Sequence, residues 1–326
     1  GFNWFQKDRR YHRFPQDSDK RMEKLDGSVG VLANNSSGGM LAFWGSIQSL
    51  KIRVKLSYMF NMGHMAYTGQ AGFDLYMGEN FDSLKFYRTA NFNFNHYEFT
   101  FFDRNEALNQ LFVLNFPLYA SVEEILVGVN EDAEVKKVEN LFPNEGKIVF
   151  YGTSITQGGC ASRPGMSYTQ IISRHLGYEC LNFGFSGNGK GHIEVAQILS
   201  TIENVKMFIL DYEANVEFTR LKSTLKPFVA ELRKKYPTVP IFIISKIIFS
   251  SETHFSKDAE EECMIRRYQE EFVKTCSIFD KNIYYIDGRT LLGDDFNEKT
   301  VDGVHPNDYG FASIARTIEN KIKEKL

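Results

Sequence analysis

A serine stands on a turn between a predicted strand and a predicted helix near the middle of the chain. Residues 152–159 read Gly-Thr-Ser-Ile-Thr-Gln-Gly-Gly, with Ser154 at the turn. A serine in this position is exposed, and the amides that follow it point toward any group bound there. The segment is not the G-x-S-x-G turn of α/β-hydrolases, because Thr156 takes the place of the second glycine. The alternative is a Ser/Thr-rich loop that only leads into a helix, so Ser154 is a candidate nucleophile.

An aspartate precedes a histidine by three positions near the end of the chain, in the segment Asp302-Gly303-Val304-His305. At this spacing on a turn, Asp302 can accept the Nδ1 proton of His305 while Nε2 faces a nucleophile. The carboxylate then fixes the tautomer and stabilises the imidazolium that forms during catalysis. The alternative is a surface turn in which Asp302 caps a helical turn. No comparable neighbours accompany the other histidines, which are His12, His64, His96, His175, His192 and His254.

Two further polar segments can hold or stabilise an anion. Residues 184–191 contain four glycines, which let the backbone approach a ligand closely and leave its amides free to donate. The alternatives are a flexible loop and a phosphate cradle with Lys190 as the counter-charge. Asn215 follows a predicted buried strand, where its side-chain amide could point at a developing oxyanion. It could equally cap the helix that follows.

The chain that carries these segments has two parts with different hydrophobic rhythms. Up to about residue 140, short runs alternate apolar and polar residues and are separated by Gly, Asn and Asp. Period-two alternation with such turns predicts antiparallel strands, and several at close spacing predict a sandwich. The runs lie at 50–56, 72–77, 92–95, 97–101 and 110–114.

From Lys147 onward, short apolar strands alternate with helices, which predicts a parallel sheet covered on both faces. Five strands fit a flavodoxin-like sheet, so the predicted fold class is α/β preceded by an all-β domain. The junction at 141–146 divides the chain into domains 1–142 and 143–326. The predicted strands lie at 148–151, 181–183, 205–210, 241–244 and 283–286. The predicted helices lie at 167–176, 193–202, 217–236, 258–279 and 307–326.

The four polar segments follow the first, second, third and fifth predicted strands of the parallel sheet. Sites in open parallel sheets form at the carboxyl ends of the strands, so one pocket would gather all four segments. Each segment alone is weak evidence, whereas their order along the sheet predicts a shared site.

On these motifs the chain resembles the SGNH/GDSL hydrolase superfamily over about residues 147–326. The resemblance implies that Ser154 is the nucleophile and that Asp302 and His305 complete a catalytic triad. It also implies an oxyanion hole made by the amides of Ser154 and Gly187 and the side chain of Asn215. The usual third block of the family is G-x-N-D, and only Asn215 matches it here.

Residues 160–168 and 61–69 resemble a two-domain subgroup of that superfamily, whose members carry an N-terminal β-sandwich of jelly-roll type. On this resemblance Arg163 and His64 are candidate substrate contacts near the mouth of the site. For His64, a structural turn between strands is the alternative. The departure of the third block from G-x-N-D places Glu213 near the pocket as a candidate specificity residue.

We therefore expect a serine esterase that hydrolyses short-acyl esters, with an acetylated carbohydrate as the expected substrate and no metal or organic cofactor. An acyltransferase and an esterase for another acyl ester stay open. Two rivals come from other classes. One is a non-catalytic carbohydrate-binding protein, against which the intact Ser154, Asp302 and His305 argue. The other is a phosphate or nucleotide binder that uses the loop at 184–191.

Bulk properties narrow the class of partner. The formal net charge of -3 favours neither nucleic acid nor an anionic membrane surface. No apolar run approaches the roughly 20 residues needed to cross a bilayer, so we expect no membrane insertion. The first residues carry no signal peptide, although a secreted or periplasmic location is favoured. Four unpaired cysteines are expected, at 160, 180, 263 and 276. The oligomeric state is not predicted.

Overall fold

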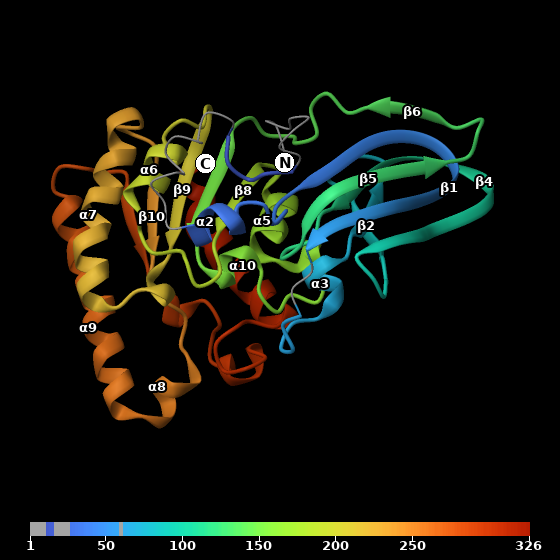
Figure 1. Ribbon diagram of the computed structural model, residues 1–326. Coiled ribbons are helices and arrows are strands. Elements are labelled where there is room, and N and C mark those ends of the chain that lie inside the picture. Colours follow the sequence, from blue (N-terminus) through green and yellow to red (C-terminus); the bar gives the residue numbers. More distant parts are fainter. Residues whose placement is uncertain (1–10, 16–26, 59–60) are drawn as a thin grey trace.

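The computed structural model describes residues 11–15, 27–58 and 61–326. Figure 1 shows two sheets side by side, an antiparallel one built before residue 138 and a parallel one built from residue 147 onward. The parallel sheet is flanked by long helices, whereas the antiparallel sheet carries few. The predicted order of an all-β part followed by an α/β part is confirmed.

The N-terminal sheet has six antiparallel strands in the order β3-β2-β4-β1-β5, with β6 paired to β1. Register shifts interrupt the pairing of β1 with β4, and such bulges bend a strand. The long strands accordingly curve in Figure 1. The strands are β1 (Met40–Tyr58), β2 (Asp74–Gly78), β3 (Lys85–Thr89), β4 (His96–Asn115), β5 (Ser121–Val129) and β6 (Glu134–Lys137). Two short helices precede and interrupt them, α2 (Gly27–Leu32) and α3 (Tyr67–Ala71).

One expected strand of this sheet is absent. The predicted strand at 92–95 is wrong, because those residues form a turn that leads into β4. Of the two phenylalanines in this run, Phe92 packs against the core of the sheet, whereas Phe94 is 72% exposed. The runs predicted separately at 97–101 and 110–114 are two parts of the single strand β4.

The C-terminal sheet has five parallel strands in the order β11-β10-β9-β7-β8, which is the predicted flavodoxin-like arrangement. The chain enters the sheet at the interior strand β7, crosses to the edge strand β8 on one side and then adds β9, β10 and β11 on the opposite side. The switch point beside β7 is where such sheets bind ligands. The strands are β7 (Lys147–Gly152), β8 (Glu179–Gly184), β9 (Val205–Asp211), β10 (Ile241–Ile244) and β11 (Ile283–Ile286).

Alternate residues of the buried strands feed two separate cores. On β7, Val149 and Tyr151 pack with α6, α7 and α9, whereas Ile148 and Phe150 pack with α5 and α10. Because both faces are covered, the strands are apolar throughout. The α-helices are α4 (Ser154–Gln157), α5 (Tyr168–Leu176), α6 (Ile193–Leu199), α7 (Phe218–Lys235), α8 (Ser250–His254), α9 (Ser256–Cys276) and α10 (Asp308–Ile322). Short 3-10 helices are η2 (Pro164–Met166), η3 (Glu213–Asn215), η4 (Gly288–Thr290), η5 (Phe296–Lys299) and η6 (Lys323–Lys325).

A buried arginine fastens the N-terminal segment to the parallel sheet. Arg13 donates to the carbonyl oxygens of Gly184 at 2.6 Å, Leu32 at 2.7 Å and Asn182 at 3.2 Å. Its guanidinium also lies over the ring of Phe185, 4.6 Å from the centroid. Burial lowers the pKa of Arg13 to about 9. This residue therefore joins the start of the chain to the end of β8, from which the glycine loop begins.

An ion pair with a buried carboxylate joins the antiparallel sheet to the loop after α4. The carboxylate of Asp74 on β2 accepts hydrogen bonds from Arg163 at 2.9 Å and from the amide of Gly165 at 2.8 Å. Asp74 has no exposed side-chain surface, and Arg163 also donates to the Tyr76 hydroxyl at 2.7 Å. The loop after α4 is thus held against the antiparallel sheet.

We expect Arg163→Met to lower the free energy of unfolding by about 3 kcal/mol, because it leaves the buried Asp74 carboxylate without its cation. Urea unfolding at neutral pH measures the change. Arg289→Met is the matched control, since its side chain and that of its partner Asp287 are 55% and 26% exposed, and ion pairs at the surface contribute at most about 1 kcal/mol. An equal loss of unfolding free energy in the two variants would contradict the stabilising role assigned to the ion pair of Arg163 with Asp74.

Candidate active site

Ser154 lies on the tight turn between β7 and α4, as its first helical residue. The Thr153 side chain accepts from the amide of Ile155, and Gly158 ends the helix with a left-handed φ of 106°. Amides in the first turn of a helix have no partner within the helix, so the amide of Ser154 is left without one in α4. Ser154 is 7% exposed.

The glycine loop after β8 packs directly on this turn. A Cβ at Gly184 would lie 2.1 Å from the amide nitrogen of Gln157, and one at Gly189 would lie 2.1 Å from the carbonyl oxygen of Gly152. No side chain fits at either place. The Gln157 side chain also accepts from the amide of Ser186 at 3.0 Å. The close approach fixes the loop relative to Ser154.

His305 reaches Ser154 from the loop before α10. Its Nε2 lies 2.9 Å from the Ser154 Oγ, and its Nδ1 lies 2.8 Å from an Asp302 carboxylate oxygen. The other carboxylate oxygen of Asp302 accepts from the amides of His305 at 2.7 Å and Val304 at 3.1 Å. Partial burial acts to raise the pKa of Asp302, but the hydrogen bonds from His305 outweigh it and leave the pKa below its ordinary value. Asp302 is therefore ionised at neutral pH.

Asn215 lies at the end of η3 and is fixed by the glycine loop. Its side-chain oxygen accepts from the amide of Gly189 at 3.3 Å, which leaves its NH₂ group as a donor. Gly187 has a left-handed φ of 67°, and a Cβ there would meet nothing within 4 Å. The loop thus presents Gly187 to open space beside the serine turn. When a hydroxyl attacks an ester carbonyl, a tetrahedral oxyanion forms. Together these groups can bind that oxyanion.

Family models match both parts of the chain. The model described as the GDSL-like lipase/acylhydrolase family matches residues 145–323. The chain belongs to this family. A second model, named GxDLY and described as the N-terminus of SGNH-hydrolase-type esterases, matches residues 1–135. Residues 72–76 read Gly-Phe-Asp-Leu-Tyr, in agreement with that name. The protein is an ester-hydrolysing serine hydrolase.

Solved structures share the whole two-part fold. A protein described as a GDSL-like lipase from Bacteroides ovatus is 32% identical, with a TM-score of 0.89 over 97% of this chain and 91% of its own. The salicylyl-acyltransferase SsfX3 from a tetracycline biosynthetic pathway is 18% identical, with a TM-score of 0.77 over 96% and 89%. A family two carbohydrate esterase from Clostridium thermocellum is 14% identical, with a TM-score of 0.62 over 89% and 93%. Comparison with curated protein sequences gave no significant match.

A partly buried acid behind the nucleophile turn was not singled out from the sequence. Asp211, at the end of β9, accepts hydrogen bonds from Thr156 on α4 and from the Tyr168 hydroxyl, both at 3.2 Å. Burial raises the pKa of Asp211 to about 7, against the hydrogen bonds that lower it. Only its position just after a predicted strand could have marked it.

Glu213, the candidate specificity residue, is 3% exposed and faces the protein interior. It accepts hydrogen bonds from the amide of Lys246 at 2.9 Å and from the side chain of Gln269. Burial raises its pKa, in opposition to the hydrogen bond from Lys246. These contacts hold η3, which carries Asn215, against β10 and α9. A role for Glu213 in specificity through its position in η3 stays a prediction.

Arg163 and His64, the two candidate substrate contacts, lie in different parts of the structure. Arg163 is engaged by Asp74 and Tyr76 at the junction of the sheets, and its guanidinium lies 3.7 Å from the centroid of the Phe86 ring. His64 is exposed and lies beside His305, with ring centroids 5.3 Å apart. Their contacts with substrate stay predictions.

The cysteines are unpaired, as expected. Cys160 and Cys180 are buried, whereas Cys263 is exposed on α9. Burial and the charge of Asp302 raise the pKa of Cys160 to about 12, so its thiol is neutral at physiological pH. No helix in the described part of the chain is long and apolar enough to cross a membrane.

We expect Asn215→Ala to lower kcat for ester hydrolysis by about 10²–10³, because one donor to the oxyanion is lost. Steady-state kinetics with a p-nitrophenyl ester measure the effect, and KM should change much less than kcat. Asn140→Ala is a control, since Asn140 lies in the linker between the two parts of the chain. An unchanged kcat in Asn215→Ala would remove Asn215 from the oxyanion hole.

We expect Asp211→Asn to flatten the pH dependence of stability. Its folded pKa of about 7 lies above the unfolded value, so the folded state holds an extra proton between about pH 4 and 7 and loses stability as the pH rises. The wild type should lose about 2–3 kcal/mol relative to Asp211→Asn between pH 5 and pH 8. Urea unfolding at both pH values measures this difference, and parallel profiles for the two proteins would contradict it.

Proposed function

We propose that the protein hydrolyses short-acyl esters through a Ser154 acyl-enzyme, with His305 as general base and Asp302 as its orienting acid. The supporting observation is the pair of hydrogen bonds that links the three side chains, 2.9 Å from Oγ to Nε2 and 2.8 Å from Nδ1 to the carboxylate. His305 takes the Ser154 proton as the hydroxyl attacks the ester carbonyl. It then returns that proton to the leaving alcohol, and water repeats the sequence on the acyl-enzyme.

The charge that forms on the carbonyl oxygen in this proposal is held by three donors: the amides of Ser154 and Gly187 and the NH₂ group of Asn215. The proposal is supported by the bond between the Asn215 oxygen and the Gly189 amide, which orients the NH₂ group before any substrate binds. Donors that are fixed in advance stabilise the transition state without reorganisation.

For the acid part of the ester we propose a short acyl group. Ser154 is largely enclosed between the nucleophile turn, the glycine loop and the His305 loop, which favours a small acyl group over a long chain. For the alcohol part we propose a carbohydrate, in line with the carbohydrate esterase neighbour, which was solved in complex with cellohexaose. That neighbour supports the proposal through its shared two-part fold only.

Acyl transfer to an alcohol is the second candidate. It is favoured by one observation, the likeness to a salicylyl-acyltransferase over 96% of this chain. Hydrolysis and transfer share the acyl-enzyme and differ only in whether water or an alcohol attacks it.

We expect turnover of p-nitrophenyl esters to be highest for acetate and to fall as the acyl chain lengthens. Ser154→Ala should lower kcat/KM by about 10⁴–10⁶. Ser200→Ala is the control, because Ser200 lies at the end of α6 away from the glycine loop. Activity that survives in Ser154→Ala would overturn the nucleophile assignment, and a flat chain-length profile would remove the short-acyl proposal.

Acetylated oligosaccharides then test the alcohol part in the same assay. Release of acetate that depends on Ser154 would support a carbohydrate substrate. Mass spectrometry of the products in the presence of added alcohols distinguishes the two reactions, since a new ester would indicate transfer and free acid alone would indicate hydrolysis.

A further inference from the structure

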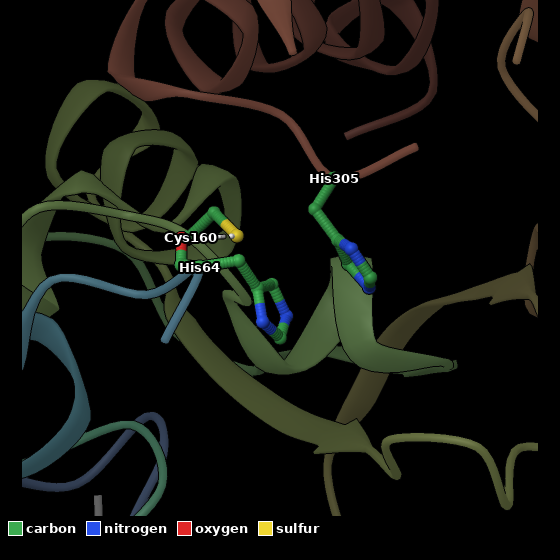
Figure 2. Close-up of side chains that lie close together, drawn as sticks. All are labelled: His64, Cys160 and His305. Carbon is green, nitrogen blue, oxygen red and sulfur yellow. Dashed lines mark hydrogen bonds between the residues drawn. The ribbon is translucent and has the colours of Figure 1, made fainter. Parts of the chain in front are cut away.

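Three metal-binding side chains meet beside the nucleophile. His64, Cys160 and His305 each offer one ligand atom, and these atoms all lie within 4.8 Å of one another. Figure 2 shows the two imidazole rings and the sulfur facing a common space. The residues come from the loop before α3, the loop after α4 and the loop before α10. Because the three residues lie far apart in the chain, their spacing matches no zinc-binding motif.

Cys160 has no part in the proposed ester hydrolysis, although its backbone and side chain are fixed beside His64 and His305. It is buried and has a left-handed φ of 71°, which residues with a Cβ seldom adopt. Its thiol donates to the carbonyl oxygen of His64 at 3.4 Å, the contact drawn in Figure 2. The contact holds the His64 loop of the N-terminal part next to His305.

We propose that His64, Cys160 and His305 form a zinc site whose occupation inhibits the enzyme. Two imidazole nitrogens and one thiolate are ligands that Zn²⁺ prefers, whereas Mg²⁺ and Ca²⁺ prefer oxygen. Three protein ligands leave a fourth tetrahedral position, and the Ser154 Oγ lies 2.9 Å from His305 Nε2. Asp302 accepts from His305 Nδ1, and a carboxylate on the second ring nitrogen is the usual support of a zinc-bound histidine.

The cluster needs a small contraction to bind the ion. Zinc binds nitrogen at about 2.0–2.1 Å and sulfur at about 2.3 Å, so tetrahedral ligand atoms lie about 3.3–3.8 Å apart. The exposed His64 can supply part of this movement by turning its ring, and small shifts of His305 and Cys160 supply the rest. Binding transfers the thiol proton of Cys160 to solvent, and the sulfur ligates as thiolate.

Inhibition follows from the ligand that the ion shares with catalysis. This consequence rests on the proposed function of His305 as general base. A zinc ion on Nε2 occupies the lone pair that would take the Ser154 proton, so acylation stops. Removal of the ion restores the free imidazole, which makes the inhibition reversible.

The test combines kinetics with a spectrum that does not depend on activity. In EDTA-treated and desalted protein, one equivalent of Zn²⁺ should abolish p-nitrophenyl acetate hydrolysis, EDTA should restore it, and Mg²⁺ should have no effect. Co²⁺ in place of zinc should give the near-ultraviolet thiolate-to-cobalt charge-transfer band.

Variants identify the site. Cys160→Ser, with Cys160→Ala as a second variant, should keep metal-free activity and lose the cobalt band. The inhibitory zinc concentration should rise by more than the roughly 10–100-fold that loss of an outer-shell partner costs. Cys263→Ser is the matched control, because it removes an exposed thiol elsewhere and should behave as the wild type.

Equal zinc inhibition in the wild type and in Cys160→Ser would overturn the proposal, as would cobalt binding without a thiolate band. A thiolate band in a protein that hydrolyses no p-nitrophenyl ester would instead overturn the proposed short-acyl function and leave the metal site standing. The two proposals therefore fail separately.

Discussion

The hydrogen bond between the Ser154 hydroxyl and the His305 imidazole imposes the main constraint on this structure. It joins the end of the interior strand β7 to a loop that follows the edge strand β11, 151 positions later in the chain. Several contacts hold that loop in place. Thr300 pairs with Pro306 across it, and Asp308, just beyond it, accepts from the amide of Ser162 at 2.8 Å. Ser162 belongs to the loop after α4, so the two sides of the hydrogen bond are braced against each other.

The parallel half of the fold could be predicted almost completely from the sequence, because its strands are buried on both faces and its helices are amphipathic. All five strands followed from the alternation of apolar runs with helices, and the flavodoxin-like sheet that five such strands fit has the observed order. The antiparallel half was harder. Its strands are half exposed, and bulges in β1 and β4 break the alternation. The sequence therefore divided β4 into two strands, and the exposed strand β6 had no apolar run to mark it.

Motifs located the loops of the candidate site, because they stand at strand ends. Side-chain directions could not be predicted in the same way. Glu213 follows a strand as Asn215 does, yet one turn of η3 directs it into the interior toward Lys246. Arg163 is directed to Asp74 by the packing of the two sheets. The Asp211 contacts and the cluster at Cys160 each bring together residues from three or more segments. No pattern in the sequence predicts that these segments meet in space.

The N-terminal half also supplies part of the wall around the nucleophile. The Tyr119 hydroxyl donates to the Ser154 carbonyl oxygen at 3.2 Å, and the Gln157 side chain donates to the Leu118 carbonyl oxygen at 3.1 Å. Met65 packs in the same core as α5 and α10. Excision of this half would uncover that core and strip α4 of its support. A chimera that exchanges it with another family member would acquire a new rim around the serine along with a new sheet.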